Sequence, residues 1–393
     1  MAIAIVLFIP TIILFIECMA ALLPTRKLRR TGSAPPERVN VLVPAHNEEL
    51  GIRATIQALL PQLNAVDQLL VVADNCTDNT AAVAREAGAT VLERQNLEQR
   101  GKGYALDFGV RWMEQDPPDV VVIVDADCRV APGSLARLTE VAMTQHRPVQ
   151  SVYLIESPPN PPPKTAISTL AVTVKNWVRL TGLYNLGMPC LLTGTGMAMP
   201  WAIIQNAPLA SGNIVEDMHL GMDLAIAGHS PLFCPDAYVT SLLPLKDKAA
   251  KQQRTRWEHG HLQTSLTLSP KLISLGLRKQ RLDLLVLGLD LLVPPLSLLV
   301  MFWLVAIALA GIGAWVGASV VPLILLAAIG GLILIAVLSA WAKYCRQQLP
   351  AKTLLTIPLY VLWKIPLYFA FLFKRQKAWV RTDRDTPDPT AKP

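Results

Sequence analysis

Three long apolar runs constrain this chain more than any other feature. Residues 1–23 are almost wholly apolar, and further runs cover residues 284–310 and 319–342. A helix of about 20 apolar residues crosses the ~30 Å hydrocarbon layer of a bilayer. Hydrophobic residues make up 52% of the chain, which is more than a soluble enzyme usually carries. We therefore predict a multi-pass membrane protein in which these runs form transmembrane helices.

The first apolar run has two interpretations, a cleaved signal peptide or an uncleaved anchor. A signal peptide carries basic residues before its apolar stretch, whereas here Arg26 and Lys27 follow it. This order favours an anchor at residues 1–23, followed by a basic linker at residues 24–38. Because basic flanks favour the cytoplasmic side, we predict a cell-membrane protein with its N-terminus outside and residues 24–283 in the cytoplasm.

The last apolar run, residues 353–373, is interrupted by Pro358, Lys364 and Pro366. The tail, residues 374–393, is basic and is predicted to be cytoplasmic. A further crossing would place that tail outside, so we predict a re-entrant or interfacial helix here. A charged lysine inside an apolar run is costly unless its ammonium faces protein, water or a group of opposite charge. Lys364 is therefore expected either near the phosphate of a bound molecule or the entrance of the active site, or at the membrane interface.

The net charge of +7 and the six cysteines exclude several classes of function. The basic residues gather beside apolar runs, which suits the headgroups of membrane lipids. No basic stripe interleaved with aromatics occurs elsewhere, so no nucleic-acid partner is predicted. The cysteines are scattered without metal-binding spacing, which indicates reduced structural thiols.

Between the first two apolar runs, short apolar strands alternate with helical segments. This alternation predicts a Rossmann-like α/β domain over residues 39–275, with a parallel sheet, helices on both faces and functional residues at the carboxyl ends of the strands. The expected strands are residues 39–45, 69–74, 89–93 and 119–127, and the expected helices are residues 48–62, 77–87, 103–115, 165–184 and 247–263.

The strongest chemical signal is the pair Asp125 and Asp127, directly after the apolar segment VVIV. Alternation along an extended strand end places both carboxylates on one side. Such a pair suits Mg²⁺ or Mn²⁺, which also bind phosphate oxygens. A lone DxD is often a solvated turn, but the position at the end of a buried strand favours a metal site.

Two further signals lie at neighbouring strand ends. Asp74 ends the strand LLVVAD and can accept a hydrogen bond from a base or ribose, whereas Asp78 behind it can cap a helix. The segment Arg100-Gly101-Lys102-Gly103 precedes a helix. Its glycines permit close backbone approach and its cations face phosphate charge.

Two polar segments follow in the second half of the domain. Glu216 and Asp217 open a helix, either as favourable charge at its N-terminus or as a general base. The segment QRTRW, residues 253–257, is either a basic amphipathic helix on the membrane or a binder of diphosphate and sugar.

In order, the segments VPAHNEE, ADNCTD, RGKG, DAD, ED and QRTRW resemble the membrane-bound family 2 glycosyltransferases, which include cellulose-, chitin- and hyaluronan-synthase-like enzymes and many exopolysaccharide transferases. The resemblance covers about residues 38–263 and the flanking membrane helices. QRTRW fits the family's Q(Q/R)xRW pattern in full, whereas His46 stands where the family usually has Tyr.

The resemblance implies a GT-A-type catalytic domain that binds a nucleotide-sugar donor, with UDP the favoured nucleotide. The implied donor site consists of Glu48 and Asp74 at the uridine, Lys102 near the diphosphate, Asp125 at the ribose or phosphate, Arg254 and Arg256 at the diphosphate, and Asp127 with Asp125 at the metal.

The resemblance also implies the acceptor side of the site. Asp217 would be the catalytic base, with Glu216 the first alternative. Trp257 and the turn residues Gly194, Thr195 and Gly196 are assigned to the acceptor.

The expected activity is that of an inverting hexosyl or N-acetylhexosaminyl transferase acting on a lipid-linked or polysaccharide acceptor at the cytoplasmic membrane face. Two alternatives remain at this point. One is a processive synthase that also translocates its polymer, and the other is an inactive membrane protein that binds nucleotide sugars.

Overall fold

The computed structural model describes residues 1–25, 38–157, 161–242 and 247–373. The described residues form two compact units. The sheet unit holds residues 38–156, 190–242 and 247–260, and the helical unit holds residues 1–25, 157, 161–189 and 261–373. The expected domain at 39–275 coincides with neither unit, since residues 161–189 pack with the apolar helices. Most of the expected linker and the whole basic tail lie outside the described residues.

In the described part of the sheet unit, eight strands form one sheet in the order β3-β2-β1-β4-β7-β6-β8-β5. The strands are β1 (Val39–Ala45), β2 (Gln68–Asp74), β3 (Thr90–Arg94), β4 (Val120–Ile123), β5 (Cys128–Val130), β6 (Val149–Glu156), β7 (Met197–Pro200) and β8 (Leu232–Leu242). The helices of this unit are α2 (Ile52–Leu59), η1 (Leu60–Gln62), α3 (Thr80–Glu86), α4 (Lys102–Met113), α5 (Ser134–Gln145), α8 (Trp201–Ile204), α9 (Glu216–Ile226) and the first part of α10 (Asp247–Arg278).

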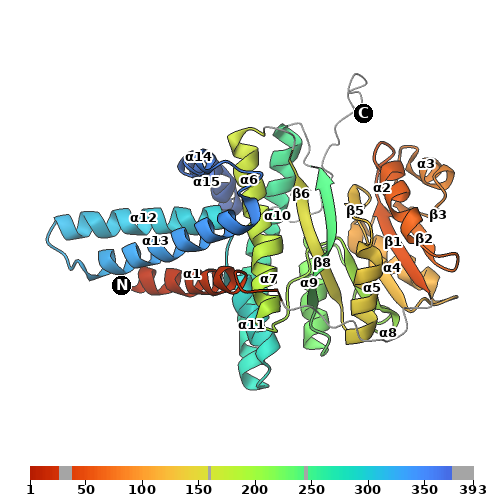
Figure 1. The fold of residues 1–393 in the computed structure, drawn as a ribbon, viewed down its shortest axis with the longest axis horizontal. Coiled ribbons are helices and arrows are strands. Elements are labelled where there is room, and N and C mark those ends of the chain that lie inside the picture. Colours follow the sequence, from red (N-terminus) through yellow and green to blue (C-terminus); the bar gives the residue numbers. More distant parts are fainter. Residues whose placement is uncertain (26–37, 158–160, 243–246, 374–393) are drawn as a thin grey trace. The chain divides into compact units, whose positions relative to one another are not determined.

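The central strands are apolar on both faces because helices cover both sides of the sheet (Figure 1). Alternate side chains of β1 point in opposite directions. Val41 and Val43 pack into one core with α2, α3 and α5, whereas Leu42 packs into the other core with α4, α8 and α9. The predicted helices on both faces are therefore confirmed.

The expectation of a parallel sheet is correct for the first four strands and for the pairing of β6 with β8, but not for the whole sheet. β1 pairs in parallel with β2 and β4, and β2 pairs in parallel with β3. By contrast, β7 runs antiparallel to β4 and β6, and β5 runs antiparallel to β8. The expected strand at 119–127 ends at Ile123, because the chain turns through Asp125 and restarts as β5. Strands as short as β5 and β7 leave too little periodicity in the sequence to be recognised.

The helical unit contains three helices that are long and apolar enough to cross a membrane among the residues described. They are α1 (Ala2–Ala20), α12 (Leu296–Trp315) and α13 (Val321–Ala340), the last continuing through the π-helical turn η3 (Trp341–Cys345). The remaining helices of the unit are α6 (Pro163–Thr173), the π-helical turn η2 (Val174–Val178), α7 (Arg179–Asn185), α11 (Leu282–Leu292), α14 (Ala351–Leu354), α15 (Ile357–Phe373) and the part of α10 that begins at His261.

The expected span at 284–310 is wrong in its boundaries. The chain breaks at Val293-Pro294-Pro295, so that α11 ends at Leu292 and the membrane-length helix starts at Leu296. Proline lacks the N–H that a helix interior needs, and two in succession separate the helices. The expected span at 319–342 matches α13 closely.

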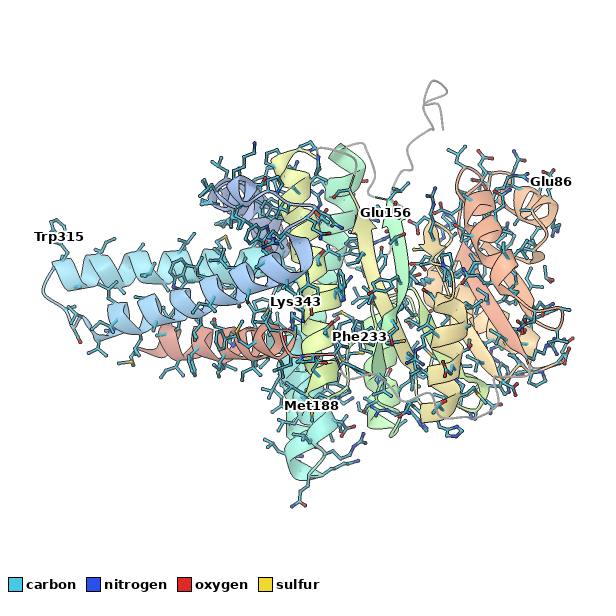
Figure 2. All side chains as sticks on the ribbon, in the orientation of Figure 1. Glu86, Glu156, Met188, Phe233, Trp315 and Lys343 are labelled. Carbon is cyan, nitrogen blue, oxygen red and sulfur yellow. The ribbon has the colours of Figure 1, made fainter. Side chains whose placement is uncertain are left out.

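The membrane-length helices share one buried cluster and run side by side in Figure 1. Trp303 lies across Gly330 and donates its indole N–H to the Leu326 carbonyl at 2.7 Å, so a small residue permits close packing of α12 on α13. Figure 2 shows Trp315 and Lys343 at opposite ends of this helix pair. Tryptophan and lysine at opposite ends are typical of helices that cross a bilayer.

Lys364 lies in α15 and is 1% exposed. Its ammonium lies 5.5 Å from the ring centroid of Tyr360 and 5.8 Å from that of Trp363. The Lys164 ammonium lies 3.8 Å from the Trp363 centroid. The burial of Lys364 argues against the interpretation that it reaches the membrane interface. α15 is apolar but shorter than the three membrane-length helices, and its re-entrant or interfacial character remains a prediction.

Three charged side chains are buried together in the helical unit. Arg179 donates its Nε–H to Glu17 Oε2 at 2.6 Å and a second N–H to the carboxylate of Asp290. Each of the three is at most 6% exposed. The contacts join α1, α7 and α11, and Gly182 lies so close to the Glu17 backbone that a Cβ would clash with it. These ion pairs therefore fix the first helix against the two others.

We expect Arg179→Met to destabilise the protein by roughly 3–5 kcal/mol, because it leaves two buried carboxylates without their cation. Glu17→Gln should cost less, because Arg179 keeps Asp290. The control Arg281→Met breaks an ion pair with Asp283 whose side chains are 28% and 29% exposed, and it should cost about 0–1 kcal/mol. Thermal unfolding in detergent measures the three variants, and equal midpoints for both arginine variants would contradict the expectation.

Candidate active site

A cavity of about 520 Å³ lies in the sheet unit, at the carboxyl ends of β1 and β2 and the turn after β4. This volume is typical of sites for small ligands and cofactors. The predicted site residues that line it are Glu48, Asp74, Lys102, Asp125, Asp127, Arg256 and Trp257. The structure thus brings together seven residues that the sequence analysis drew from five separate segments.

The loops after β1 and β2 are held together by side-chain hydrogen bonds. Asn47 accepts from the Thr77 N–H at 2.7 Å and donates to the Thr77 hydroxyl at 3.1 Å. The Glu48 N–H donates to Thr80 Oγ1 at 2.7 Å. Asn47 adopts a positive φ of 56°, which asparagine tolerates better than most residues. This bonding fixes the backbone of Glu48, which lines the cavity.

Asp74 is the last residue of β2 and is 6% exposed. Its Oδ1 accepts from Arg94 at 2.6 Å and from the Asn75 amide at 3.0 Å. The His46 ring bonds to the Asp74 carbonyl oxygen at 2.7 Å through Nδ1, which must carry the proton because a carbonyl only accepts. Arg94 belongs to none of the motifs found in the sequence, and Asn75 lies in the ADNCTD motif but was given no role there.

The RGKG segment forms a tight turn into α4. Gly101 has a φ of +129°, which disfavours a side chain, and a Cβ on Gly103 would lie 2.5 Å from the Leu209 carbonyl oxygen. Both glycines are therefore required by local geometry. The turn places Lys102 at the first position of α4, facing the cavity.

The Lys102 ammonium is surrounded by acceptors. It lies 2.5 Å from Asp125 Oδ1, 2.6 Å from the Gly194 carbonyl oxygen and 3.6 Å from Glu216 Oε1. Burial alone would lower the pKa of Lys102, but the Asp125 and Glu216 carboxylates raise it above its ordinary value. Lys102 therefore stays charged at neutral pH.

Asp125, Asp127 and Cys128 offer ligand atoms that lie within 4.8 Å of one another. Burial raises the pKa of the Cys128 thiol well above its usual value, so the sulfur stays protonated and lies 3.6 Å from Asp127 Oδ1. The two carboxylates are the hard oxygen donors that Mg²⁺ and Mn²⁺ prefer, and both line the cavity. The donor set therefore fits a divalent cation that shares its remaining positions with phosphate oxygens and water.

Glu216 and Asp217 open α9, as predicted, but neither lines the cavity itself. Glu216 contacts Lys102, and a Cβ built on Gly194 would lie 3.3 Å from Asp217 Oδ2. Burial raises the pKa of the Glu216 carboxyl to about 7, opposed by Lys102 and reinforced by Asp217. Both acids therefore lie beside Lys102 and the turn at residues 193–197.

That turn is organised by Gln150, which is fully buried and was missed by the sequence analysis. Its side chain donates to the Thr195 carbonyl at 2.9 Å and accepts from the Thr193 N–H at 2.8 Å. The Thr195 hydroxyl in turn accepts from the Asp125 N–H at 3.0 Å. Gly194, Thr195 and Gly196 thus adjoin the carboxylates but do not line the cavity.

The segment QRTRW lies in α10, where helical geometry decides which side chains reach the cavity. Gln253, Arg256 and Trp257 are spaced i, i+3, i+4, share one face and line the cavity. Arg254 points elsewhere: it is 6% exposed and is not a lining residue. The placement of Arg254 at the donor diphosphate therefore has no support in the cavity geometry, and Gln253 takes a position that the sequence analysis left unassigned.

Comparison with known proteins gives one family. The model described as "Glycosyltransferase like family 2" matches residues 35–260, more than half of the 393 residues. The "Probable glycosyltransferase YdaM" of Bacillus subtilis (strain 168) is 26% identical over 239 residues, which cover 57% of this chain and 55% of that protein. Glucosyl-3-phosphoglycerate synthase of Mycobacterium tuberculosis (strain ATCC 25618 / H37Rv) is 34% identical over 95 residues, 23% of this chain and 28% of that protein. The chain thus spans about half the length, or less, of these curated relatives.

Among solved structures, the mannosyltransferase PcManGT from Pyrobaculum calidifontis, in complex with GDP-Man and Mn²⁺, has a TM-score of 0.58 at 20% identity. The match covers 95% of this chain and 99% of that chain. At this identity the likeness is one of fold. The predicted combination of a GT-A-type α/β domain with apolar helices able to span a membrane is thereby confirmed.

We expect Gln150→Met to destabilise the protein by about 1–3 kcal/mol, because it leaves the Thr193 N–H and the Thr195 carbonyl buried without their partner. The control is Gln95→Met, since Gln95 is exposed and makes one hydrogen bond of 3.4 Å. Thermal unfolding midpoints of the two variants check this expectation, and equal midpoints would show that the turn does not depend on Gln150.

Proposed function

This chain belongs to glycosyltransferase-like family 2, and we propose that it moves one sugar from a nucleotide-sugar donor to a lipid-linked or polysaccharide acceptor at the cytoplasmic face of the cell membrane. The observation that carries this proposal is the convergence of Asp125, Asp127, Lys102 and Arg256 on one cavity. The two carboxylates suit a divalent metal ion, and the two basic side chains suit phosphate groups. Together they suit a nucleoside diphosphate.

The donor is proposed to bind with its nucleoside at Glu48 and Asp74 and its diphosphate toward Lys102 and Arg256. All four residues line the cavity. The fold relative PcManGT was solved with GDP-Man and Mn²⁺, which supports a nucleoside diphosphate sugar and a divalent cation here. The family resemblance favours a uridine nucleotide, so UDP-linked and GDP-linked sugars are the two donor classes to compare.

Asp125 and Asp127 would hold Mg²⁺ or Mn²⁺, which when bound offsets the negative charge of the departing nucleoside diphosphate. Lys102 and Arg256 contribute further positive charge to the same leaving group. Asp217 accepts the proton of the acceptor hydroxyl while the oxygen of that hydroxyl forms a bond to the sugar carbon C1. The bond from C1 to the diphosphate oxygen breaks in the same displacement, so the anomeric configuration inverts.

The membrane-length helices support an acceptor that is held at a membrane. Three such helices occur among the described residues, and membrane lipids are accordingly proposed as partners of the helical unit. With the N-terminus outside, α1 enters the cytoplasm, α12 crosses outward and α13 returns. The loop between α12 and α13 is then external, and the sheet unit is cytoplasmic.

A labelling experiment tests this topology. Ala318, between α12 and α13, and Gln115, in the sheet unit, are both exposed. In intact cells a membrane-impermeant maleimide should label Ala318→Cys, and it should label Gln115→Cys only after permeabilisation. The unsubstituted protein measures the background of its own six cysteines. Labelling of Gln115→Cys in intact cells would overturn the proposed orientation.

A pair of substitutions separates the metal from the base. Asp127→Ala removes a hard ligand, so donor binding should weaken and lose its dependence on Mn²⁺. Asp217→Asn keeps size and polarity but cannot take a proton, so transfer should fall by roughly 10²–10⁴-fold in kcat while donor binding survives. Donor affinity by calorimetry and nucleoside diphosphate release with a panel of nucleotide sugars measure both effects.

The control for this pair is Asp236→Asn. Asp236 lies on β8, is exposed, and pairs with Arg137 of α5. It should leave binding and transfer unchanged. If Asp217→Asn transfers sugar at the unsubstituted rate, Asp217 is only a carboxylate at a helix start and Glu216 becomes the candidate base. If the unsubstituted protein neither transfers nor hydrolyses any donor of the panel, the proposed activity is wrong.

A further inference from the structure

Arg94 ends β3, the strand at one edge of the sheet, and lies directly opposite Asp74 in the parallel pairing of β2 with β3. The side chains of Arg94 and Asp74 are 9% and 8% exposed. Arginine is rarely buried to this extent unless it is paired. Arg94 does not line the 520 Å³ cavity, whereas Asp74 does. The buried guanidinium of Arg94 therefore contacts Asp74, which lines the cavity, without lining the cavity itself.

The guanidinium of Arg94 connects two parts of the donor site. Its Nη1 donates to Asp74 Oδ1 at 2.6 Å and to the Gln99 carbonyl at 2.9 Å. Its Nη2 donates to Gln99 Oε1 at 3.4 Å, and its carbon lies 5.6 Å from the ring centroid of Tyr104. Gln99 belongs to the loop that leads into Lys102. Arg94 thus holds the Asp74 carboxylate and also contacts the loop before Lys102, whereas the Lys102 ammonium itself is held by Asp125 and the Gly194 carbonyl.

The bonds to Asp74 define its orientation. Arg94 and the Asn75 amide both donate to Oδ1, and His46 fixes the Asp74 backbone carbonyl from the other side. The two side-chain donors to the carboxylate both use Oδ1, and Asp74 lines the cavity, so Oδ2 is the oxygen available to a ligand there. A carboxylate oxygen in this position suits a nucleobase that presents an N–H donor, as the ring imides of uracil and guanine do.

We propose that Arg94 is a positioning residue for the nucleoside of the donor, acting through Asp74. This inference rests on the proposed function, because it assigns the base to the Asp74 end of the cavity. Without Arg94, Asp74 would lose the charge-assisted hydrogen bond that holds its buried carboxylate in place, and only the weaker bond from the Asn75 amide would remain. Nucleoside affinity should then depend on a residue that never touches the nucleoside.

The test compares ligands with and without a base. With Mn²⁺ present, Arg94→Met should weaken the binding of UDP or GDP by about 10–100-fold and change the affinity for inorganic pyrophosphate by less than about 3-fold. Arg94→Lys should recover part of the nucleotide affinity, because it restores the charge without the fork that spans Asp74 and Gln99. Calorimetry on the full chain in detergent measures all three ligands.

The matched control is Arg85→Met. Arg85 bonds to Glu93 at 2.6 Å, the same length as the Arg94 bond to Asp74, but both partners are about half exposed. This variant should bind nucleotide normally. A double-mutant cycle with Asp74→Asn completes the test: Arg94→Met should cost less than about 3-fold when Asp74 is already replaced, since the two residues act as one unit.

The outcomes separate this inference from the proposed function. If the unsubstituted protein binds neither UDP nor GDP in the presence of Mn²⁺, the proposed function fails and the inference fails with it. If the unsubstituted protein binds nucleotide and Arg94→Met binds it equally well, the inference alone is overturned. It is also overturned if Arg94→Met weakens the binding of pyrophosphate as much as the binding of nucleotide. The same holds if Arg94→Met lowers nucleotide affinity by the same factor whether or not Asp74 is replaced by Asn.

Discussion

The ammonium of Lys102 is the contact on which the rest of the site depends. It joins the turn after β4, the loop before β7 and the start of α9, through Asp125, the Gly194 carbonyl and Glu216. Without this cation, the carboxylates gathered here would repel one another in a partly desolvated space. The carboxylates still outnumber the Lys102 ammonium. This excess of negative charge favours the binding of a divalent cation at Asp125 and Asp127.

Much of this site follows from sequence because the rule that places it is local. Carboxyl ends of parallel strands meet at one edge of a sheet, so Asp74 and Asp125 converge once the strands are recognised. Helical periodicity then distinguishes residues that share an α10 face: Gln253, Arg256 and Trp257 reach the cavity, while Arg254, one position along, does not. The motif QRTRW alone does not separate these positions, so the placement of Arg254 at the donor stays a prediction that the cavity lining does not support.

The positioning residues could not be predicted in the same way. Gln150 bonds to a turn more than forty positions later, and Arg94 bonds to Asp74 across a strand pairing. Neither contact has a sequence pattern, because it depends on which strands become neighbours and in which register. The strands β5 and β7 were missed for a different reason, because three and four residues are too few to show an alternating pattern. By contrast, the break before α12 was readable from two adjacent prolines, and hydropathy averaging over residues 284–310 concealed it.

The first apolar run shows how one polar residue changes the meaning of a hydrophobic segment. Glu17 lowers the mean hydropathy of residues 1–23 only slightly. Its carboxylate nevertheless forms an ion pair with Arg179, which lies 162 positions away, and Arg179 also pairs with Asp290. Removal of residues 1–23 would leave this buried guanidinium without one of its two carboxylates and would expose the apolar surface of α13 that α1 covers. A signal peptide that is cut away has no need of such contacts. The buried ion pairs therefore support the proposal that α1 stays in the protein as an anchor, because its removal would destabilise the helices that remain.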